Sequence, residues 1–389
     1  MANKNIVMFL DGTWNSPEDE TRVWAAKNLI SGTHNGVEQE VYYDKGLGTQ
    51  KFEKFQGGVF GKGLGKNVRQ AYAWLSKNYE DGDNVYIFGF SRGSFTATSI
   101  TGMIMRWGLI HPNSPLSVDE VFKLYEKWDE HTPLYELEFQ KKDGKTDFSK
   151  LEAQLLDTSR RISIKMIGIW DSVATVGVPL GNFARFSKNA LRFHNPRIST
   201  IYENVFHALA IDEHRKPFRP ILFHFFYKRD ASQADYDKNK KKYGDRIEQR
   251  WFSGSHGDVG GGDNIPVSNA PYAWLLGHAQ SLGLGVNGTM PDTSPVHTQP
   301  LNNPFNKFVF GLYKIFRLGK RYYRTIGAAS TPVKNNGMIE TLSETIDASV
   351  LKRRKNDPEY RPKNLEIWAA EAGVNLDNEA GDIKIMRSR

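Results

Sequence analysis

Residues 84–102 of the chain, NVYIFGFSRGSFTATSITG, decide the fold. The apolar run at 85–88 has the length of a strand, and residues 94–105 continue with small side chains, no proline and isoleucines at helical spacing. Ser91 lies between these two segments. The stretch therefore predicts a strand, a sharp turn and a helix, with a serine at the turn.

The turn itself, GFSRG at residues 89–93, has the GxSxG pattern of a nucleophile elbow. A side chain at Gly89 or Gly93 would collide with the strand or the helix. The turn would hold the Ser91 hydroxyl above the sheet edge, where helix N–H groups can face an oxyanion. Short glycine and serine patterns also arise by chance in a chain with 35 glycines, so an ordinary strand-to-helix turn is the alternative.

The composition is that of a folded globular protein. With 389 residues, 39% hydrophobic and 12% aromatic, the chain can bury the core of one large or two medium domains. The absence of cysteine excludes disulfides, thiolate catalysis and cysteine-ligated metals. No apolar run approaches the ~20 residues that cross a bilayer, and the N-terminus runs directly into a short strand. We therefore expect a chain that is cytoplasmic as synthesised, without a general secretory signal.

The net charge of +8 comes almost entirely from one segment. Between Asp292 and Glu340 the sequence has no acidic residue and seven cations: Lys307, Lys314, Arg317, Lys320, Arg321, Arg324 and Lys334. A local basic segment, and not a generally basic protein, needs explanation. We therefore expect no nucleic-acid partner.

Periodicity and turn residues predict the other elements. Strands are expected at 6–10, 38–43, 162–170, 221–227 and 248–253, and helices at 68–79, 117–130, 200–211 and 271–281. Residues 57–67 are expected to form a glycine-rich loop, because their spacing misses that of a phosphate-binding loop. The polar region 131–160 is expected to form an excursion from the main sheet. A charged surface loop is expected at 228–245, and residues 178–196 form either a flap over the site or a surface loop.

Three residues follow expected strands at their carboxyl ends: Ser91, Asp171 and His256. In an open α/β sheet these positions share one edge, where ligands bind. Their chain order, serine, then aspartate, then histidine, is that of the α/β-hydrolases. His256 would act as the base and Asp171 as the acid that orients it. The sequence predicts an α/β-hydrolase-like single domain with insertions, in which helices cover both faces of a mostly parallel sheet.

Other histidines and a metal site are the alternatives for this constellation. Among ten histidines, His214 is the main competitor as base, while His207 and His224 are expected in the core or on a helix face. The glycines after His256 favour it, because they let the backbone crowd a site. Nitrogen and oxygen ligands could come from Asp11, Asp171, His256, Asp258 and Asp263. No metal-binding spacing is present, so we expect no metal and no cofactor, with Asp258 and Asp263 fixing their loop through local hydrogen bonds.

Ordered blocks of sequence then resemble a known family. They are DGTWN at 11–15, YDKGLGT at 43–49, GFSRG at 89–93, IWDSVA at 169–174 and HGDVGGG at 256–262. Together they resemble the α/β-hydrolase domain of bacterial type VI secretion phospholipase effectors, from about residue 5 to 365. The resemblance places the triad at Ser91, Asp171 and His256, and implies phospholipase A type cleavage of fatty-acyl esters of glycerophospholipids. It also implies a membrane-damaging antibacterial effector, exported by a type VI system, with secretion-apparatus and immunity proteins as partners.

The chain departs from that family in two ways. Effectors of the family often carry large membrane-binding regions, whereas here we expect a hydrolase domain at 1–365 and only a tail at 366–389. Gly257 stands where the family commonly has serine.

For the oxyanion we expect the N–H of Arg92 and a second donor around Gly12 and Thr13. The rival functions are a soluble-ester or thioester hydrolase, and a catalytically idle scaffold that binds anionic lipid or nucleic acid.

The basic segment is expected to form an amphipathic helix on the phospholipid surface, within a membrane-facing stretch at 304–325. Apolar residues recur on one face: Phe305, Val309, Leu312, Phe316 and Tyr323. Cations recur on the opposite face: Lys314, Arg317, Arg321 and Arg324. This arrangement is typical of a helix that binds an anionic membrane peripherally. A surface helix packed on the sheet is the alternative.

Overall fold

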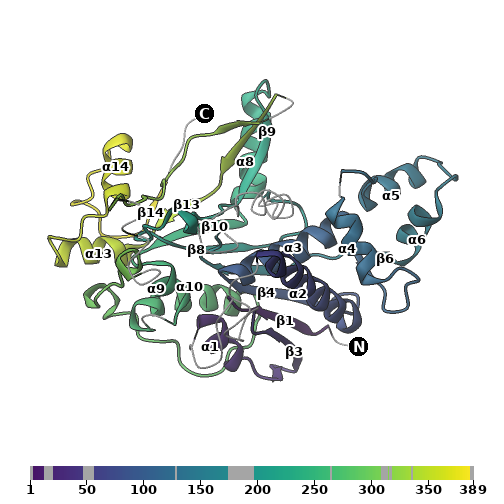
Figure 1. The fold of residues 1–389 in the computed structure, drawn as a ribbon, viewed down its shortest axis with the longest axis horizontal. Helices are drawn as coiled ribbons and strands as arrows, with labels where there is room; N and C mark the ends of the chain where they lie inside the picture. Colours follow the sequence, from purple (N-terminus) through teal and green to yellow (C-terminus); the bar gives the residue numbers. More distant parts are fainter. Residues whose placement is uncertain are drawn as a thin grey trace.

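A nine-stranded, mostly parallel sheet forms the centre of the computed structural model (Figure 1). The structure describes residues 3–12, 21–46, 57–127, 129–173, 197–262, 265–307, 314, 318–333 and 336–385. The strand order is β14-β13-β10-β8-β7-β4-β1-β3-β2, and only the edge strands β2 and β14 run antiparallel to their neighbours. The bounds are β1 (Asn5–Leu10), β2 (Thr33–His34), β3 (Val37–Asp44), β4 (Asn84–Phe90), β7 (Met166–Trp170), β8 (Val205–Ala210), β10 (Ile247–Phe252), β13 (Glu344–Ile346) and β14 (Ile383–Lys384).

The described residues also form two small antiparallel sheets outside the main one. One pairs β5 (Leu109–Ile110) with β6 (Ser159–Arg160), and the other holds β11 (Thr331–Val333), β12 (Gly337–Thr341) and β9 (His224–Lys228). The helices are α1 (Arg22–Asn28), α2 (Gly57–Asn78), α3 (Arg92–Trp107), α4 (Val118–Glu126), α5 (Leu134–Lys142), α6 (Lys150–Thr158), α8 (Gln233–Gly244), α9 (His256–Gly260), α10 (Ile265–Ser281), α11 (Pro304–Lys307), α13 (Ala348–Asn356) and α14 (Lys363–Ala372).

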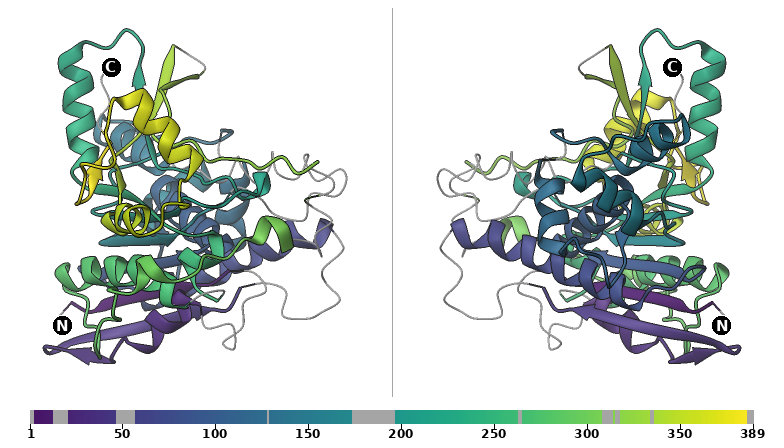
Figure 2. Two further views of the ribbon diagram at one scale, coloured as in Figure 1. Left: turned by 90° about the vertical axis from the view of Figure 1, so that its left-hand side faces the viewer. Right: turned by 90° about the vertical axis from the view of Figure 1, so that its right-hand side faces the viewer.

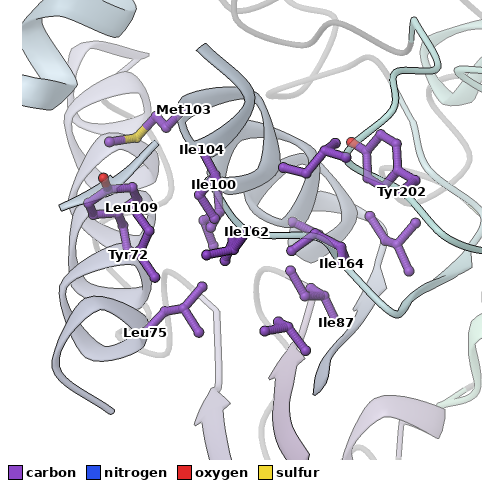
Figure 3. Close-up of a cluster of buried hydrophobic side chains, with 14 of the residues drawn as sticks. Tyr72, Leu75, Ile87, Ile100, Met103, Ile104, Leu109, Ile162, Ile164 and Tyr202 are labelled. Atoms are coloured by element: carbon purple, nitrogen blue, oxygen red, sulfur yellow. The ribbon is translucent and has the colours of Figure 1, made fainter. Parts of the chain in front are cut away.

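Helices cover both faces of the main sheet because its strands point alternate side chains to opposite sides. Ile87 of β4 faces α2 and α3, where Leu75 and Ile100 join the same buried cluster (Figure 3). The next residue, Phe88, faces α1 and α10 on the other side, in a cluster with Leu275. A central strand buried on both faces is a run of apolar residues, as residues 85–88 are. The predicted fold class is confirmed.

The C-terminal helices α13 and α14 pack at the β13 end of the sheet. Their buried residues Leu351, Leu365 and Trp368 form a third cluster with Trp251 of β10. At the opposite end of the molecule, α5 and α6 project from the sheet (Figure 1). The domain boundary at residue 365 stays a prediction, with β14 of the expected tail paired to β13.

Three segments differ from the sequence-based expectation. Residues 205–210, expected as helix, form the central strand β8. The prediction was wrong because a strand buried on both faces lacks the alternation of apolar and polar residues that marks a half-buried strand. Residues 57–67, expected as a loop, begin α2; each glycine there costs about 1 kcal/mol of helix stability but does not end a helix. The charged stretch 228–245 contains α8, which extends past one side of the main sheet (Figure 2). Its buried residue Tyr236 packs on Phe225 and Tyr227 of β9.

Two expected strands also differ. The strand expected at 162–170 begins only at Met166, and the one expected at 221–227 is β9 of a small sheet. The helix expected at 117–130 is α4, and it begins at a capping box in which the Ser117 hydroxyl accepts from the Glu120 N–H. The possible flap at 178–196 lies outside the described residues.

Candidate active site

Ser91, Asp171 and His256 lie together at the carboxyl edge of the sheet. Ser91 follows β4, Asp171 follows β7 and His256 begins α9 shortly after β10. Strands β4 and β7 are neighbours, and only β8 separates β7 from β10. The parallel register therefore brings residues that are far apart in sequence to one point.

The turn at Ser91 is as sharp as the sequence predicts. Ser91 has φ 56° and ψ −116°, a conformation that costs a non-glycine residue free energy, and its N–H donates to the Trp170 carbonyl at 3.1 Å. A Cβ at Gly93 would lie 1.9 Å from the Leu10 oxygen, and one at Gly89 would lie 2.8 Å from the Cα of Ser94. Glycine is required at both positions because backbone occupies the space of a side chain.

The imidazole of His256 links the serine to the aspartate. Its Nε2 lies 2.9 Å from the Ser91 Oγ, and its Nδ1 lies 2.6 Å from Asp171 Oδ2. The ring is packed between Phe90, with ring centroids 4.8 Å apart, and Phe218, at 5.1 Å. These contacts hold the ring in the plane that joins both partners, the arrangement that base-assisted attack by a hydroxyl requires.

The Asp171 carboxylate is fully buried and bound to an arginine. Arg324 donates to Asp171 Oδ1 at 2.6 Å and to Oδ2 at 2.9 Å, and the Ala210 N–H donates to Oδ1 at 3.0 Å. Burial favours the neutral carboxyl, but the charge of Arg324 and the hydrogen bond from His256 outweigh it, so the pKa of Asp171 lies well below its ordinary value. The carboxylate is therefore ionised throughout the range in which histidine titrates.

Arg324 corrects one sequence-based expectation. We expected it on the lipid-facing cationic side of a helix, yet its side chain is 0% exposed and ion-paired with Asp171. The helix expected to run to Tyr323 does not exist over the described residues 318–324, where Leu318 and Gly319 adopt positive φ. A glycine and two tyrosines around this turn weaken the helix, and the ion pair draws the chain into the core.

Asp258 contacts different partners from Asp171. Its carboxylate accepts from the Ser255 N–H at 2.9 Å and from the Asn302 side chain at 2.8 Å, and it caps α9. Burial raises the pKa of Asp258. The local role expected for this carboxylate agrees with these bonds, while Asp263 lies outside the described residues.

The competing histidines bind other partners. The Nδ1 of His214 is 3.2 Å from the Tyr322 carbonyl, and His224 belongs to β9 of a small sheet. His207 is buried and accepts from the Ser172 N–H at 3.1 Å, and burial lowers its pKa to about 4. His256 is therefore the histidine that contacts Ser91.

Of the expected oxyanion donors, Arg92 lies at a helix N-terminus, whereas the Gly12 N–H is already hydrogen-bonded. Arg92 is the first residue of α3, so its N–H lies at the positive end of that helix. The Gly12 N–H donates to Asp11 Oδ1 at 2.7 Å, and Thr13 lies outside the described residues. The second donor stays a prediction.

Within the described ranges, no group of three acidic or histidine side chains could hold a metal ion. Asp11 accepts instead from Thr21 and Tyr43, at 2.5 and 3.0 Å. No helix in the same ranges is both long and apolar enough to cross a bilayer.

Comparison with known proteins adds a family to this geometry. Residues 4–278 match the family described as the catalytic domain of Tle1-like type VI secretion (T6SS) phospholipase effectors. The chain belongs to this family. The sequence blocks that resembled it include the elbow at 89–93 and the glycine loop at 256–262, which both contribute to the Ser91–His256 contact.

Relatives of this Tle1-like chain differ in length. An uncharacterized Saccharomyces cerevisiae protein, YEL023C, is 29% identical over 242 residues, which cover 57% of the chain but only 33% of the yeast protein. An uncharacterized Pseudomonas aeruginosa protein shares 15% identity at a TM-score of 0.42, over 79% of this chain and 49% of that one. The Tle1 effector, solved bound to the VgrG spike, shares 15% identity at a TM-score of 0.34, over 68% of this chain and 52% of that one. The Tle1-like chain thus spans about half or less of these proteins.

Sequence reasoning missed two parts of this Tle1-like site, Arg324 and Phe218. Arg324 lies 153 residues beyond Asp171, in a segment whose cations suggested a surface role. Phe218 lies in a short turn, and no pattern marked it as a neighbour of His256. The sequence contains one weak signal: Arg324 follows two tyrosines, and arginine forms buried ion pairs more readily than the lysines of the same segment.

Proposed function

We propose that this chain is a serine hydrolase of the phospholipase A type, which cleaves fatty-acyl esters of glycerophospholipids. The observation that carries the proposal is the continuous contact from Ser91 Oγ through the His256 ring to Asp171, at 2.9 and 2.6 Å. Family membership supports a phospholipid as the substrate.

In the proposed reaction, Ser91 Oγ attacks the acyl carbonyl while His256 Nε2 accepts its proton. Asp171 holds the Nδ1–H and stabilises the imidazolium. His256 then returns the proton to the leaving glycerol oxygen, which departs as lysolipid, and a water activated by the same ring hydrolyses the acyl-enzyme. The Arg92 N–H donates to the oxyanion, and the second donor would come from the loop at Gly12 and Thr13, where the Gly12 N–H would have to leave Asp11 Oδ1.

We expect the purified protein to release free fatty acid and lysolipid from mixed-lipid vesicles, identified by mass spectrometry. Positional isotope or acyl-chain labels in the vesicles then assign the cleaved ester bond. Cleavage of a soluble ester without any vesicle product would instead indicate a soluble-ester or thioester hydrolase. Loss of both activities in a folded protein that still binds anionic vesicles would indicate the idle scaffold.

We also propose that the basic segment brings the site to the membrane, although not as the single helix first expected. Leu318 is 84% exposed, and Lys314 and Lys320 are exposed on either side of it. An exposed leucine flanked by cations suits the headgroup region of an anionic bilayer.

The triple variant Lys314→Glu, Leu318→Ser, Lys320→Glu is expected to bind anionic vesicles at least about 30-fold more weakly, since each cation contributes about 1 kcal/mol near such a surface. Hydrolysis of a soluble short-chain ester should stay unchanged. Lys238→Glu, Lys241→Glu on α8 is the matched control and should bind like the wild type. An equal loss on the soluble ester would show that the segment is structural. Vesicle flotation measures binding.

Family membership also supports a proposal about delivery. We propose that the chain acts as an antibacterial effector that a type VI apparatus exports to a target cell. A spike protein would be its carrier and an immunity protein its inhibitor in the producing cell. The solved Tle1 effector, bound to a VgrG spike, supports this partnership.

A further inference from the structure

Four hydrogen-bond donors surround the Asp171 carboxylate, and Arg324 supplies two of them. Arg324 binds one nitrogen to each carboxylate oxygen, at 2.6 and 2.9 Å. This parallel pair fixes the carboxylate plane, because both ions are planar and rigid. Oδ2 is thereby held 2.6 Å from His256 Nδ1. Without the arginine, the Ala210 N–H would be the remaining donor to Oδ1 among the described residues.

Arg324 is itself held by the loops that frame the site. Its nitrogens donate to the carbonyls of Ala210, at 2.8 Å, and Phe218, at 2.6 Å. Two residues earlier, the Tyr322 N–H donates to the His214 carbonyl at 3.0 Å. Because the Phe218 ring packs on His256, the arginine that contacts the acid also fixes the wall beside the base.

We propose that Arg324 is a positioning residue of this hydrolase: it orients Asp171 toward His256 and keeps that carboxylate ionised. The role rests on the proposed function to the extent that Ser91, His256 and Asp171 act as a triad. It does not depend on which ester is the natural substrate.

The charges around the pair determine the sign of the expected pH effect. The Glu213 carboxylate accepts from the main-chain N–H of His256 at 3.3 Å, but it is ion-paired with Arg215, at 2.7 Å. His207 on β8 is neutral near pH 7, since burial lowers its pKa to about 4. Other titratable groups near the site are His214, which bonds to Tyr322, and Asp258, which bonds to Ser255 and Asn302.

Arg324 is therefore the only cation among the described residues that forms an ion pair with Asp171, apart from His256 when protonated. Removing it would leave a buried carboxylate that takes up a proton more readily as the pH falls. A neutral Asp171 could not support the imidazolium. The acid limb of activity should then move to higher pH.

The rate at which a fluorophosphonate probe labels Ser91 tests this role across pH without any lipid substrate. We expect Arg324→Met to be labelled about 10- to 100-fold more slowly near neutral pH, because the base is misplaced. Its acid midpoint should lie about one pH unit or more above that of the wild type. Arg324→Lys should restore most of the midpoint but only part of the rate, since an ammonium group cannot bind both oxygens in one plane.

Arg353→Met is the matched control, because Arg353 is also buried and donates to main-chain carbonyls, those of Val296 and Gln299. It should keep the wild-type midpoint. The proposal is overturned if Arg324→Met keeps the wild-type rate and midpoint, or if the control shifts equally. If Arg324→Met does not fold, Arg324→Lys decides: a slower rate together with a weakened downfield Nδ1 proton resonance of His256 supports the role, and wild-type values of both refute it.

The same experiment separates this role from the proposed function. A wild type that the probe labels but that releases no lysolipid would refute only the phospholipid substrate, and the comparison of Arg324 variants would stand. A wild type that the probe does not label at all would refute the triad and the role of Arg324 together.

Discussion

Ser91→Ala is expected to lower ester hydrolysis by at least about 10³-fold, because the nucleophile is lost while the oxyanion donors and the binding surface remain. The Ser91 hydroxyl bonds to His256 and to no structural element that the fold depends on within the described residues, so the fold should not change. Turnover of a soluble ester and of vesicles measures the effect, and circular dichroism checks the fold.

The control for this variant is Ser94→Ala, which removes a buried hydroxyl from the same helix. The Ser94 hydroxyl has no hydrogen-bond partner among the described residues, so activity should remain near that of the wild type. A fluorophosphonate probe should label the wild type and the control but not Ser91→Ala. Equal labelling of all three proteins would contradict the assignment of the nucleophile.

Asp171→Asn is expected to lower turnover by about 10³- to 10⁴-fold, since an amide can hold His256 in the wrong tautomer and cannot stabilise the imidazolium. Asp258→Asn should have a far smaller effect on turnover, because Asp258 bonds to Ser255 and Asn302 and not to the ring. Soluble-ester kinetics on both variants give the comparison. The reverse order of effects would place the acid in the glycine loop.

Asp171→Asn should also destabilise the protein. It leaves Arg324 buried without its counter-charge, a change that costs about 3–5 kcal/mol in other proteins. The pKa of Asp171 is depressed in the folded state. The ion pair therefore contributes its full stability above the ordinary carboxyl pKa of about 4 and loses it as the pH falls toward the folded-state pKa. Urea unfolding of wild type and variant at pH 7 and near pH 3 should show a difference that shrinks with acid.

The sequence predicted those parts of the site that local pattern controls. The elbow depends on two glycines and an apolar strand, and the chain order of Ser91, Asp171 and His256 matched one class of hydrolase. Their convergence required only parallel strands, which place the carboxyl ends along one edge. Local pattern was therefore sufficient for the elements nearest to Ser91.

The sequence pattern did not predict the elements and contacts that depend on tertiary packing. Residues 205–210 are buried on both faces and have no strand alternation, so only their place between β7 and β10 makes them a strand. The pairing of Arg324 with Asp171 spans 153 residues, and a basic segment gives no sign of which cation is buried. Such contacts follow from the assembled fold and not from the neighbours of a residue.

The position of Arg324 has a consequence for incomplete chains. The family match ends at residue 278, before this arginine and before β13 and β14. Because Arg324 follows them in the sequence, a ribosome makes Ser91, Asp171 and His256 well before the arginine that pairs with Asp171. A fragment that ends before residue 324 would lack the arginine that pairs with the Asp171 carboxylate. If the proposed function holds, this order of synthesis would leave unfinished copies less active than the finished enzyme.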